Sequence, residues 1–281
     1  MTRPFPAAMS RRTVLGVAAG AAMALASRTA RADALSDIKS RGEIVGATVM
    51  QFPPFDFIKD GQFAGIDREL IDGVAAELGV KARYLDLPFT SILPGLDAGK
   101  FDLCIAPLTV TIERMKHYAF TVPIADATAA LMRRADNKTI TKPSDISGKI
   151  IGGQKGSAQL AQLREFAATL PVMPTFREYT DNNQAYADLA AGRTEATTNS
   201  LPNLAYAAAQ RPDTFAVVGP PYGKASYFSW AGRLGEADQS LMAAVNAALL
   251  KMETDGRMAT IQTKYFGEAI KLPTTLPAPL V

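Results

Sequence analysis

The sequence contains one cysteine and one histidine among its 281 residues, and these shortages exclude several kinds of site. Cys104 has no partner for an intramolecular disulfide. It lies in an apolar run, which favours an inert thiol in the core. With His117 as the only imidazole, a zinc site and a Ser-His or Cys-His catalytic pair are both disfavoured. We therefore predict no metal site, no cofactor and no catalytic residue.

Long hydrophobic runs are missing beyond the first 32 residues, where no run approaches the roughly 20 apolar residues that a membrane span requires. Before that point, an Ala-rich apolar run over residues 14–26 follows Arg11 and Arg12. This order is typical of an export signal, so we predict a signal peptide over residues 1–32, cleavage after Ala32 and a periplasmic mature protein. The adjacent arginines resemble a twin-arginine signal, which directs folded proteins, and the alternative is a general secretory signal.

An excess of charge of one sign is also absent from the mature chain. The 30 lysines and arginines outnumber the 27 acidic residues, but five of the arginines and none of the acids lie in the predicted signal peptide. Removing five leaves 25 basic residues against 27 acidic ones. This balance favours neither a nucleic acid nor a membrane surface as a partner. The chain is long enough for two modest domains.

The most informative stretch lies between residues 99 and 121. Residues 103–106 form a short, continuous apolar run, which is typical of a buried parallel strand. Thr111 precedes Glu113 and Arg114 and is placed to cap a helix. Ligands of open α/β sheets bind beyond the carboxyl ends of the strands, and a guanidinium there can hold a carboxylate through two charge-assisted hydrogen bonds. We therefore predict that Arg114 anchors a ligand.

The segment Gly99-Lys-Phe-Asp102, followed by Thr109-Val-Thr-Ile-Glu-Arg114, resembles the signature of the solute-binding proteins that feed polar amino-acid ABC transporters (bacterial extracellular solute-binding protein family 3). The resemblance covers residues 43–266. Further matching segments occur in the same order along the chain: Phe52-Pro-Pro-Phe-Asp-Phe57, Gly65-Ile-Asp67, Ile92-Leu-Pro-Gly-Leu96, Gly148-Lys-Ile-Ile-Gly152, Gly156-Ser157 and Ala190-Ala-Gly-Arg193.

The order of apolar runs predicts an α/β fold with two similar units, because strands alternate with helices as they do in parallel sheets with crossover helices. The first unit has expected strands at 43–49, 82–85 and 103–106, and expected helices capped by Asp67 and at 92–98. The second has expected strands at 149–153, 172–176 and 195–198, and expected helices at 158–168 and 182–191. The resemblance implies a two-lobed periplasmic-binding-protein fold with the ligand cleft between the lobes and a two-segment hinge. The expected bounds are 33–126 plus 223–268 for lobe 1, 127–222 for lobe 2 and 269–281 for a mobile, Pro-rich tail.

The resemblance also implies which residues face the ligand. In the first lobe, Phe52 and Phe89 would lie on opposite sides of it, near Ala106, Thr109 and Arg114. The second lobe would add Gln154, Ser157, the backbone of Ala158, Asn199 and Ser200. The family often has a hydroxyl where this chain has Ala158, so one side-chain contact is expected to be missing.

Beyond a small carboxylate, the resemblance leaves the ligand open. Family members commonly bind the α-ammonium of an amino acid with an aspartate at the position of Ser200, and some use another at Val49. Neither acid is present here. One hypothesis is therefore a ligand with a carboxylate and no free α-amino group. The alternative is an amino acid whose ammonium meets Glu195, Asn199 and backbone carbonyls.

The function implied by the resemblance is that of the solute-binding component of an ABC importer. It would capture an amino acid or related small carboxylate by lobe closure and deliver it to the membrane permease subunits, and we expect it to be a monomer. The alternative is a periplasmic dehydratase-like enzyme acting on a small cyclic carboxylic acid, with Glu195 as the only acid near the second-lobe strand end. A sensor module of a membrane receptor is disfavoured. We predict a binding protein without enzymatic activity.

Overall fold

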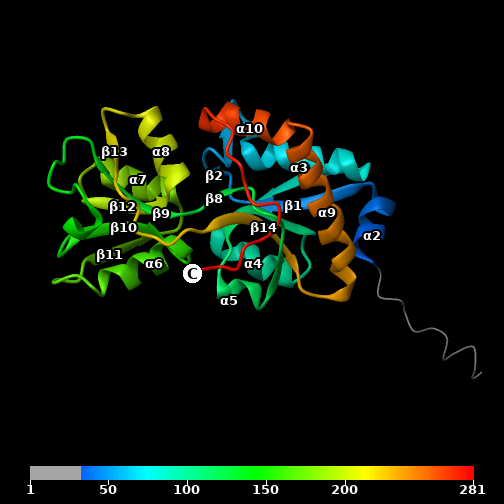
Figure 1. Cartoon of the computed structure of the whole chain (residues 1–281), viewed down its shortest axis with the longest axis horizontal. Coiled ribbons are helices and arrows are strands. Elements are labelled where there is room, and N and C mark those ends of the chain that lie inside the picture. Colours follow the sequence, from blue (N-terminus) through cyan, green and yellow to red (C-terminus); the bar gives the residue numbers. More distant parts are fainter. Residues whose placement is uncertain (1–32) are drawn as a thin grey trace, which may run out of the picture.

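The structure, a computed structural model, describes residues 33–281. The predicted signal peptide, with its arginine pair and cleavage site, lies outside the described residues. Within them the chain forms two α/β lobes that lie side by side, each with its own sheet (Figure 1). No helix in this part of the chain combines the length and the apolar character needed to cross a bilayer.

The sheet of the first lobe is built from two distant parts of the sequence. Its strand order is β5-β1-β6-β14-β7, and β8 pairs with β14. The strands are β1 Glu43–Thr48, β5 Lys81–Asp86, β6 Leu103–Thr109, β7 Tyr118–Phe120, β8 Ala125–Asp126 and β14 Tyr227–Arg233. The strand β1 runs parallel to β5 and β6, whereas β14 is antiparallel to β6. The late strand β14 therefore returns the chain to the first lobe.

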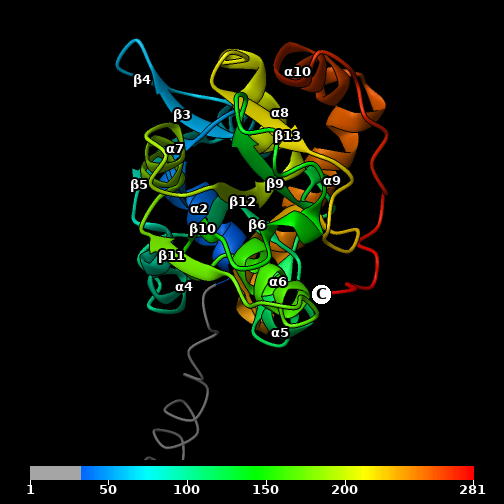
Figure 2. The same cartoon turned by 90° about the vertical axis from the view of Figure 1, so that its left-hand side faces the viewer.

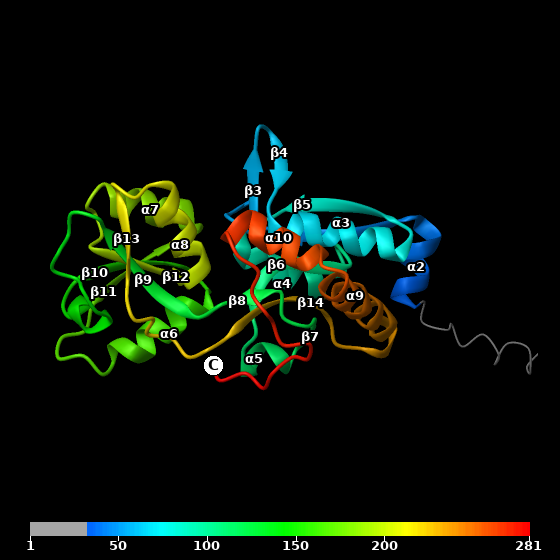
Figure 3. The same ribbon diagram turned by 45° about the horizontal axis from the view of Figure 1, so that its top comes forward.

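Alternate residues of β1 belong to the two cores on either face of this sheet. Ile44 packs in one apolar cluster with residues of α2 Ala34–Arg41, α3 Ile66–Leu78, α9 Glu236–Thr254 and α10 Arg257–Phe266. Val45 points to the other face and packs with Leu96 of α4 Phe89–Asp97. A separate small sheet consists of β2 Gln51–Phe52, β3 Asp56–Lys59 and β4 Gln62–Ala64. Figure 3 shows its β3–β4 hairpin projecting from the lobe.

The second lobe has the strand order β11-β10-β12-β9-β13. The strands are β9 Ala129–Arg134, β10 Ile150–Gln154, β11 Thr175–Tyr179, β12 Ala196–Ser200 and β13 Phe215–Val218. The helices are η1 Pro143–Ile146, α6 Ala158–Ala167, α7 Asn182–Ala190 and α8 Leu201–Gln210. In Figure 2 this lobe faces the viewer, with α6 and α7 on opposite sides of the sheet. Leu160 of α6 packs in one core, and Leu189 and Leu204 of α7 and α8 pack in the other.

The chain passes between the two sheets twice, after β8 and before β14 (Figure 1). The two passing segments are hydrogen-bonded to each other. The amide of Ala127 donates to the carbonyl of Ser226 at 2.8 Å, and the amide of Gly223 donates to the carbonyl of Ala129 at 3.0 Å. A Cβ on Gly223 would lie 2.8 Å from the Ala129 nitrogen, so the close approach requires glycine here. The lobe boundaries at 126/127 and 222/223 stay a prediction.

Two helix starts in the first lobe differ from the sequence expectation. The helix expected at 92–98 begins at Phe89, so Pro94 lies inside it instead of in its first turn. Asp67 does not cap α3: Gly65 holds that position, and the side chain of Asp67 turns into the core, where it accepts from Trp230. In the second lobe the strand expected at 172–176 is Thr175–Tyr179. The helices α2 and α8 were not expected.

The Pro-rich segment 269–281, for which the sequence predicts mobility, has no helix or strand but contacts the first lobe. The Ile270 amide donates to Gln262 Oε1 at 2.8 Å, and Leu272 is buried. The Val281 carbonyl accepts from the Ile112 amide at 2.7 Å. The segment is therefore attached near both of its ends, while its mobility stays a prediction.

Candidate functional site

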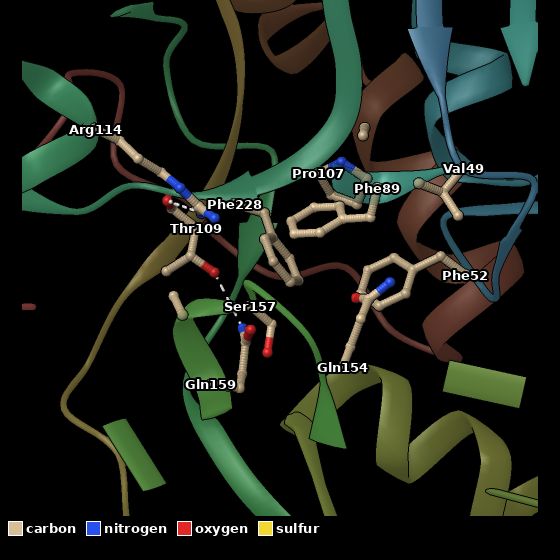
Figure 4. A pocket seen from close by; sticks show the side chains of 12 residues that line it. Val49, Phe52, Phe89, Pro107, Thr109, Arg114, Gln154, Ser157, Gln159 and Phe228 are labelled. Atoms are coloured by element: carbon tan, nitrogen blue, oxygen red, sulfur yellow. Dashed lines mark hydrogen bonds between the residues drawn. The ribbon is translucent and has the colours of Figure 1, made fainter. Parts of the chain in front are cut away.

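A pocket lies between the two lobes (Figure 4). Its lining contains eight of the ten residues predicted to face a ligand: Phe52, Phe89, Ala106, Thr109, Arg114, Gln154, Ser157 and Ala158. It also contains four that were not in that set: Val49, Pro107, Gln159 and Phe228. Ligand binding by these residues stays a prediction.

The lining residues converge because several strands end at the cleft. Val49 directly follows β1, Thr109 ends β6, and Gln154 ends β10 of the other lobe. These are carboxyl ends of strands in α/β sheets, where ligand sites form. Phe228 comes from β14, more than a hundred residues later in the chain, and reaches the same place because β14 pairs with β6.

Arg114 is held in position by its own short helix. The Thr111 hydroxyl caps α5 Ile112–Met115 and accepts from the Arg114 amide at 3.1 Å, as the sequence predicted. The guanidinium donates to the Thr109 carbonyl at 2.9 Å and across the cleft to the Gly156 carbonyl at 3.4 Å. Its Cζ lies 5.9 Å from the centre of the Phe89 ring.

The charge of Arg114 has no carboxylate partner among the described residues, since none of their ion pairs includes it. Burial lowers the pKa of Arg114 from its ordinary value, but a guanidinium stays protonated at physiological pH. A partly buried positive charge without a counter-ion favours binding of an anion, because the anion would restore the interaction lost with water.

The second lobe contributes the start of α6. The Ser157 hydroxyl caps this ten-residue helix by accepting from the Leu160 amide at 3.2 Å. The free amides at a helix start add to the attraction for an anion. The Gln154 side chain is buried at the pocket wall, where its Oε1 accepts from Asn182 Nδ2 at 3.1 Å and its Nε2 donates to the Thr180 carbonyl at 3.4 Å.

Gln159 is a lining residue that the sequence did not indicate. Its Nε2 reaches across the cleft and donates to Thr109 Oγ1 at 3.0 Å, and it also donates to the Ala127 carbonyl, in a segment that passes between the lobes, at 3.3 Å. The only available signal was its position next to Ala158 in the first turn of a predicted helix. That position placed Gln159 near the site, but the direction of its side chain depends on how the two lobes meet.

Asn199 and Ser200 are not among the residues that line the pocket, and their contact with a ligand stays a prediction. Ser200 is the N-cap of α8, and its hydroxyl is hydrogen-bonded to Asn203 Oδ1. The side-chain Nδ2 of Asn203 then donates across the cleft to the Pro53 carbonyl at 2.7 Å. Asn199 Nδ2 donates to the Tyr186 hydroxyl at 2.8 Å. Because α8 was not expected, Ser200 could not be identified as its N-cap from the sequence.

The candidate groups for other chemistry also lie elsewhere. Glu195 accepts from Lys149 Nζ at 3.2 Å and from the Ile150 amide at 3.1 Å, outside the pocket lining. Cys104 is fully buried, and burial raises the pKa of its thiol, as expected for an inert core thiol. Residues 33–281 contain no group of three His, Cys, Asp or Glu side chains placed to hold a metal ion.

A pair of fully buried carboxyl groups lies in the first lobe. Asp56 accepts from Thr48 Oγ1 at 2.6 Å, and Asp67 accepts from Trp230 Nε1 at 2.7 Å. Their other oxygens, Asp56 Oδ1 and Asp67 Oδ2, have no donor. Burial raises the pKa of both groups, and the charge of Asp67 raises that of Asp56 further. Because the two charges repel each other and both pKa values are raised, we expect the pair to keep one proton, which would give a donor to an oxygen that has none.

Comparisons with known proteins agree with this arrangement. The model of the family described as bacterial extracellular solute-binding proteins, family 3, matches residues 44–268. The chain is 29% identical over 263 residues to the L-cystine-binding protein TcyJ of Escherichia coli (strain K12), covering 92% of this chain and 96% of that protein. It is 27% identical over 220 residues to an L-arginine-binding protein of Pseudomonas aeruginosa, covering 76% and 84%.

A solved structure with a similar fold is that of the ancestral amino acid-binding protein AncCDT-1, a precursor of cyclohexadienyl dehydratase. It has a TM-score of 0.76 and 30% sequence identity, and the alignment covers 83% of this chain and 99% of that one.

Proposed function

Because the chain belongs to the bacterial extracellular solute-binding proteins of family 3, we propose that it is the solute-binding component of an ABC importer. It captures an amino acid or a related small carboxylate in the pocket between its lobes. The observation that carries this proposal is the guanidinium of Arg114, which faces the pocket without a carboxylate partner. The relatives TcyJ and the Pseudomonas protein are named for binding cystine and arginine, which both carry carboxylates.

Lobe closure fits the contacts that cross the cleft. Arg114 donates to Gly156, Gln159 donates to Thr109, and the Asn203 amide donates to Pro53, so the lobes touch on both sides of the pocket. A solute enclosed between them enters only when the lobes part, as in the hinge closure of periplasmic binding proteins. We take the moving units to be residues 33–126 with 223–268, and residues 127–222.

Replacing Arg114 tests the proposal. Arg114→Ala removes the charge-assisted pair with a ligand carboxylate, which we expect to weaken binding by about 2 to 5 kcal/mol, or about 30-fold to several thousand-fold. Arg114→Lys should recover only part of the loss, because one ammonium does not reproduce the two parallel bonds. Isothermal titration with the tightest ligand from a panel of amino acids and small carboxylates measures both effects.

A matched control is Arg83→Ala, which removes an arginine from the same lobe at a strand that lines no part of the pocket. It should bind as the unaltered protein does. Equal affinity in Arg114→Ala and Arg83→Ala would show that the guanidinium holds no ligand.

The dehydratase alternative has little support in the site. One structural neighbour is an ancestral precursor of such an enzyme, but it is itself described as an amino acid-binding protein. The pocket lining holds no acid, and Glu195, the acid considered from the sequence, is bonded to Lys149 elsewhere. Proton NMR of candidate cyclic acids incubated with the protein should show no turnover.

Membership in an extracellular family means that the protein is exported. We propose the twin-arginine route with cleavage after Ala32, transfer of the solute to the permease subunits of an ABC transporter, and a monomeric mature protein. Normal export of a variant with Arg11→Lys and Arg12→Lys would contradict the route. Intact mass and sedimentation of the periplasmic protein check the cleavage site and the monomer.

A further inference from the structure

We infer that the solute is a small monocarboxylate with a flat or branched apolar body and no ammonium group. This inference rests on the proposed binding function and narrows it. Arg114 is the only charged side chain in the pocket lining, which contains no aspartate or glutamate. A zwitterionic amino acid would pair its carboxylate with Arg114 and leave its ammonium in a closed pocket whose lining offers no carboxylate.

The acceptors around the pocket are neutral oxygens, and several of them already accept a hydrogen bond. An ammonium has three N–H donors and needs an acceptor for each when it leaves water. The two backbone carbonyls nearest the guanidinium, those of Thr109 and Gly156, already accept from Arg114. Among the side chains, Thr109 Oγ1 accepts from Gln159, and Gln154 Oε1 accepts from Asn182.

The donors, in contrast, are available. The hydroxyls of Thr109 and Ser157 each accept a hydrogen bond in the structure, so each keeps its own O–H to donate. The start of α6, whose residues Ser157, Ala158 and Gln159 line the pocket, also has backbone amides without a partner inside the helix. Together with the guanidinium they form a donor-rich end that matches the acceptor-only oxygens of a carboxylate.

The groups that could have bound an ammonium are committed to other contacts. Glu195, the acid considered for this purpose, is bonded to Lys149 and to the Ile150 amide outside the lining. Asn199 bonds Tyr186, and Ser200 holds Asn203 in the contact between lobes.

The rest of the pocket is apolar. The rings of Phe52, Phe89 and Phe228 lie around its centre in Figure 4. Val49, Ala106 and Pro107 complete this side, and none of the three has a polar side-chain group. Flat rings prefer aromatic or compact aliphatic partners, so the carboxylate end continues into an apolar body.

Matched ligand pairs test the inference. Each pair consists of an L-amino acid and the acid that lacks only its amino group: phenylalanine with 3-phenylpropanoate, leucine with 4-methylpentanoate, and tryptophan with indole-3-propanoate. In isothermal titration with the unaltered protein, we expect the desamino acid of at least one pair to bind about 10-fold to 100-fold more tightly, which is the usual effect of leaving a buried polar group unpaired.

Substitutions at Val49 add a test on the protein side. Val49→Asp places a carboxylate in the lining and should reverse the preference within the best pair. Val49→Asn, which has nearly the same shape but no charge, should keep it. A circular dichroism spectrum of each variant shows whether the fold is intact. If a variant fails to fold, the ligand pairs measured on the unaltered protein still test the inference.

The outcomes separate this inference from the proposed function. Tighter binding of the amino acids, lost in Arg114→Ala, would overturn the ligand class and leave the binding function in place. If the unaltered protein binds neither member of any pair, nor any other amino acid or small carboxylate, both the ligand class and the binding function are overturned. Tighter binding of a desamino acid, lost in Arg114→Ala, supports both.

Discussion

Replacing Asp56 with asparagine tests whether Asp56 and Asp67 share a proton in the core of the first lobe. Asparagine has almost the same shape, and its oxygen can still accept from Thr48 Oγ1. Its amide can donate to Asp67 Oδ2, which has no donor in the structure. The asparagine amide therefore provides, at every pH, the hydrogen-bond donor that the shared proton provides in the unaltered protein only while it is bound.

The raised pKa values of the two groups determine whether the free energy of unfolding rises or falls with pH. An unfolded aspartate loses its proton near pH 3.9, whereas the folded pair keeps one to a higher pH. The stabilising effect of that proton is complete below about pH 3.9 and is lost as the pH rises through the folded pKa. Within this window the unaltered protein should lose about 1.4 kcal/mol of unfolding free energy per pH unit relative to Asp56→Asn.

Urea denaturation at half-unit steps from pH 5 to pH 8 measures this difference. Asp37→Asn, which removes an exposed carboxylate from α2, is the matched control and should follow the pH dependence of the unaltered protein. As the pH rises, the unfolding free energy of Asp56→Asn should become increasingly higher than that of the unaltered protein and of Asp37→Asn. Parallel curves for all three proteins would refute the shared proton.

Two further variants probe contacts described above. Asn203→Ala removes the hydrogen bond to the Pro53 carbonyl, and we expect every ligand to bind about 2-fold to 12-fold more weakly, with the order of ligands unchanged, because only the closed state loses a contact of about 0.5 to 1.5 kcal/mol. A changed ligand order in titration would instead place Asn203 in contact with the solute. Trp230→Phe keeps most of the apolar volume but removes the donor to Asp67, and it should lower the unfolding free energy by about 1 to 3 kcal/mol in urea denaturation. Unchanged stability would mean that this hydrogen bond contributes nothing in the folded state.

Local signals explain why the helix turn that carries Arg114 could be predicted, while ligand binding by Arg114 stays a prediction. Thr111 as a cap and Arg114 in the following turn depend on residues within three positions of each other. The α/β fold and its two lobes also followed, because each strand and most helices carry their own apolar pattern, and the resemblance supplied the connections.

The remaining features depend on partners far away in the sequence. Asp67 has the residue type and position of a helix cap, but Trp230, 163 positions later, donates to it and draws it into the core. Phe228 looks like any apolar strand residue until β14 pairs with β6. Ser200 could be assigned to an internal contact only once α8 and the Pro53 loop were known to face each other.

The two passing segments between the lobes, bonded through Ala127 to Ser226 and through Gly223 to Ala129, have a mechanical consequence. A ribbon of two bonded chains bends across its plane without breaking those bonds, whereas sliding or twisting one chain against the other breaks them. We therefore expect the lobes to have one easy motion, the opening and closing of a single angle. A solute that is too thick for the pocket would hold that angle open in proportion to its excess thickness. The angle between the lobes would then depend on the thickness of the bound solute. Small-angle X-ray scattering with acids of increasing thickness would record a graded increase in the radius of gyration.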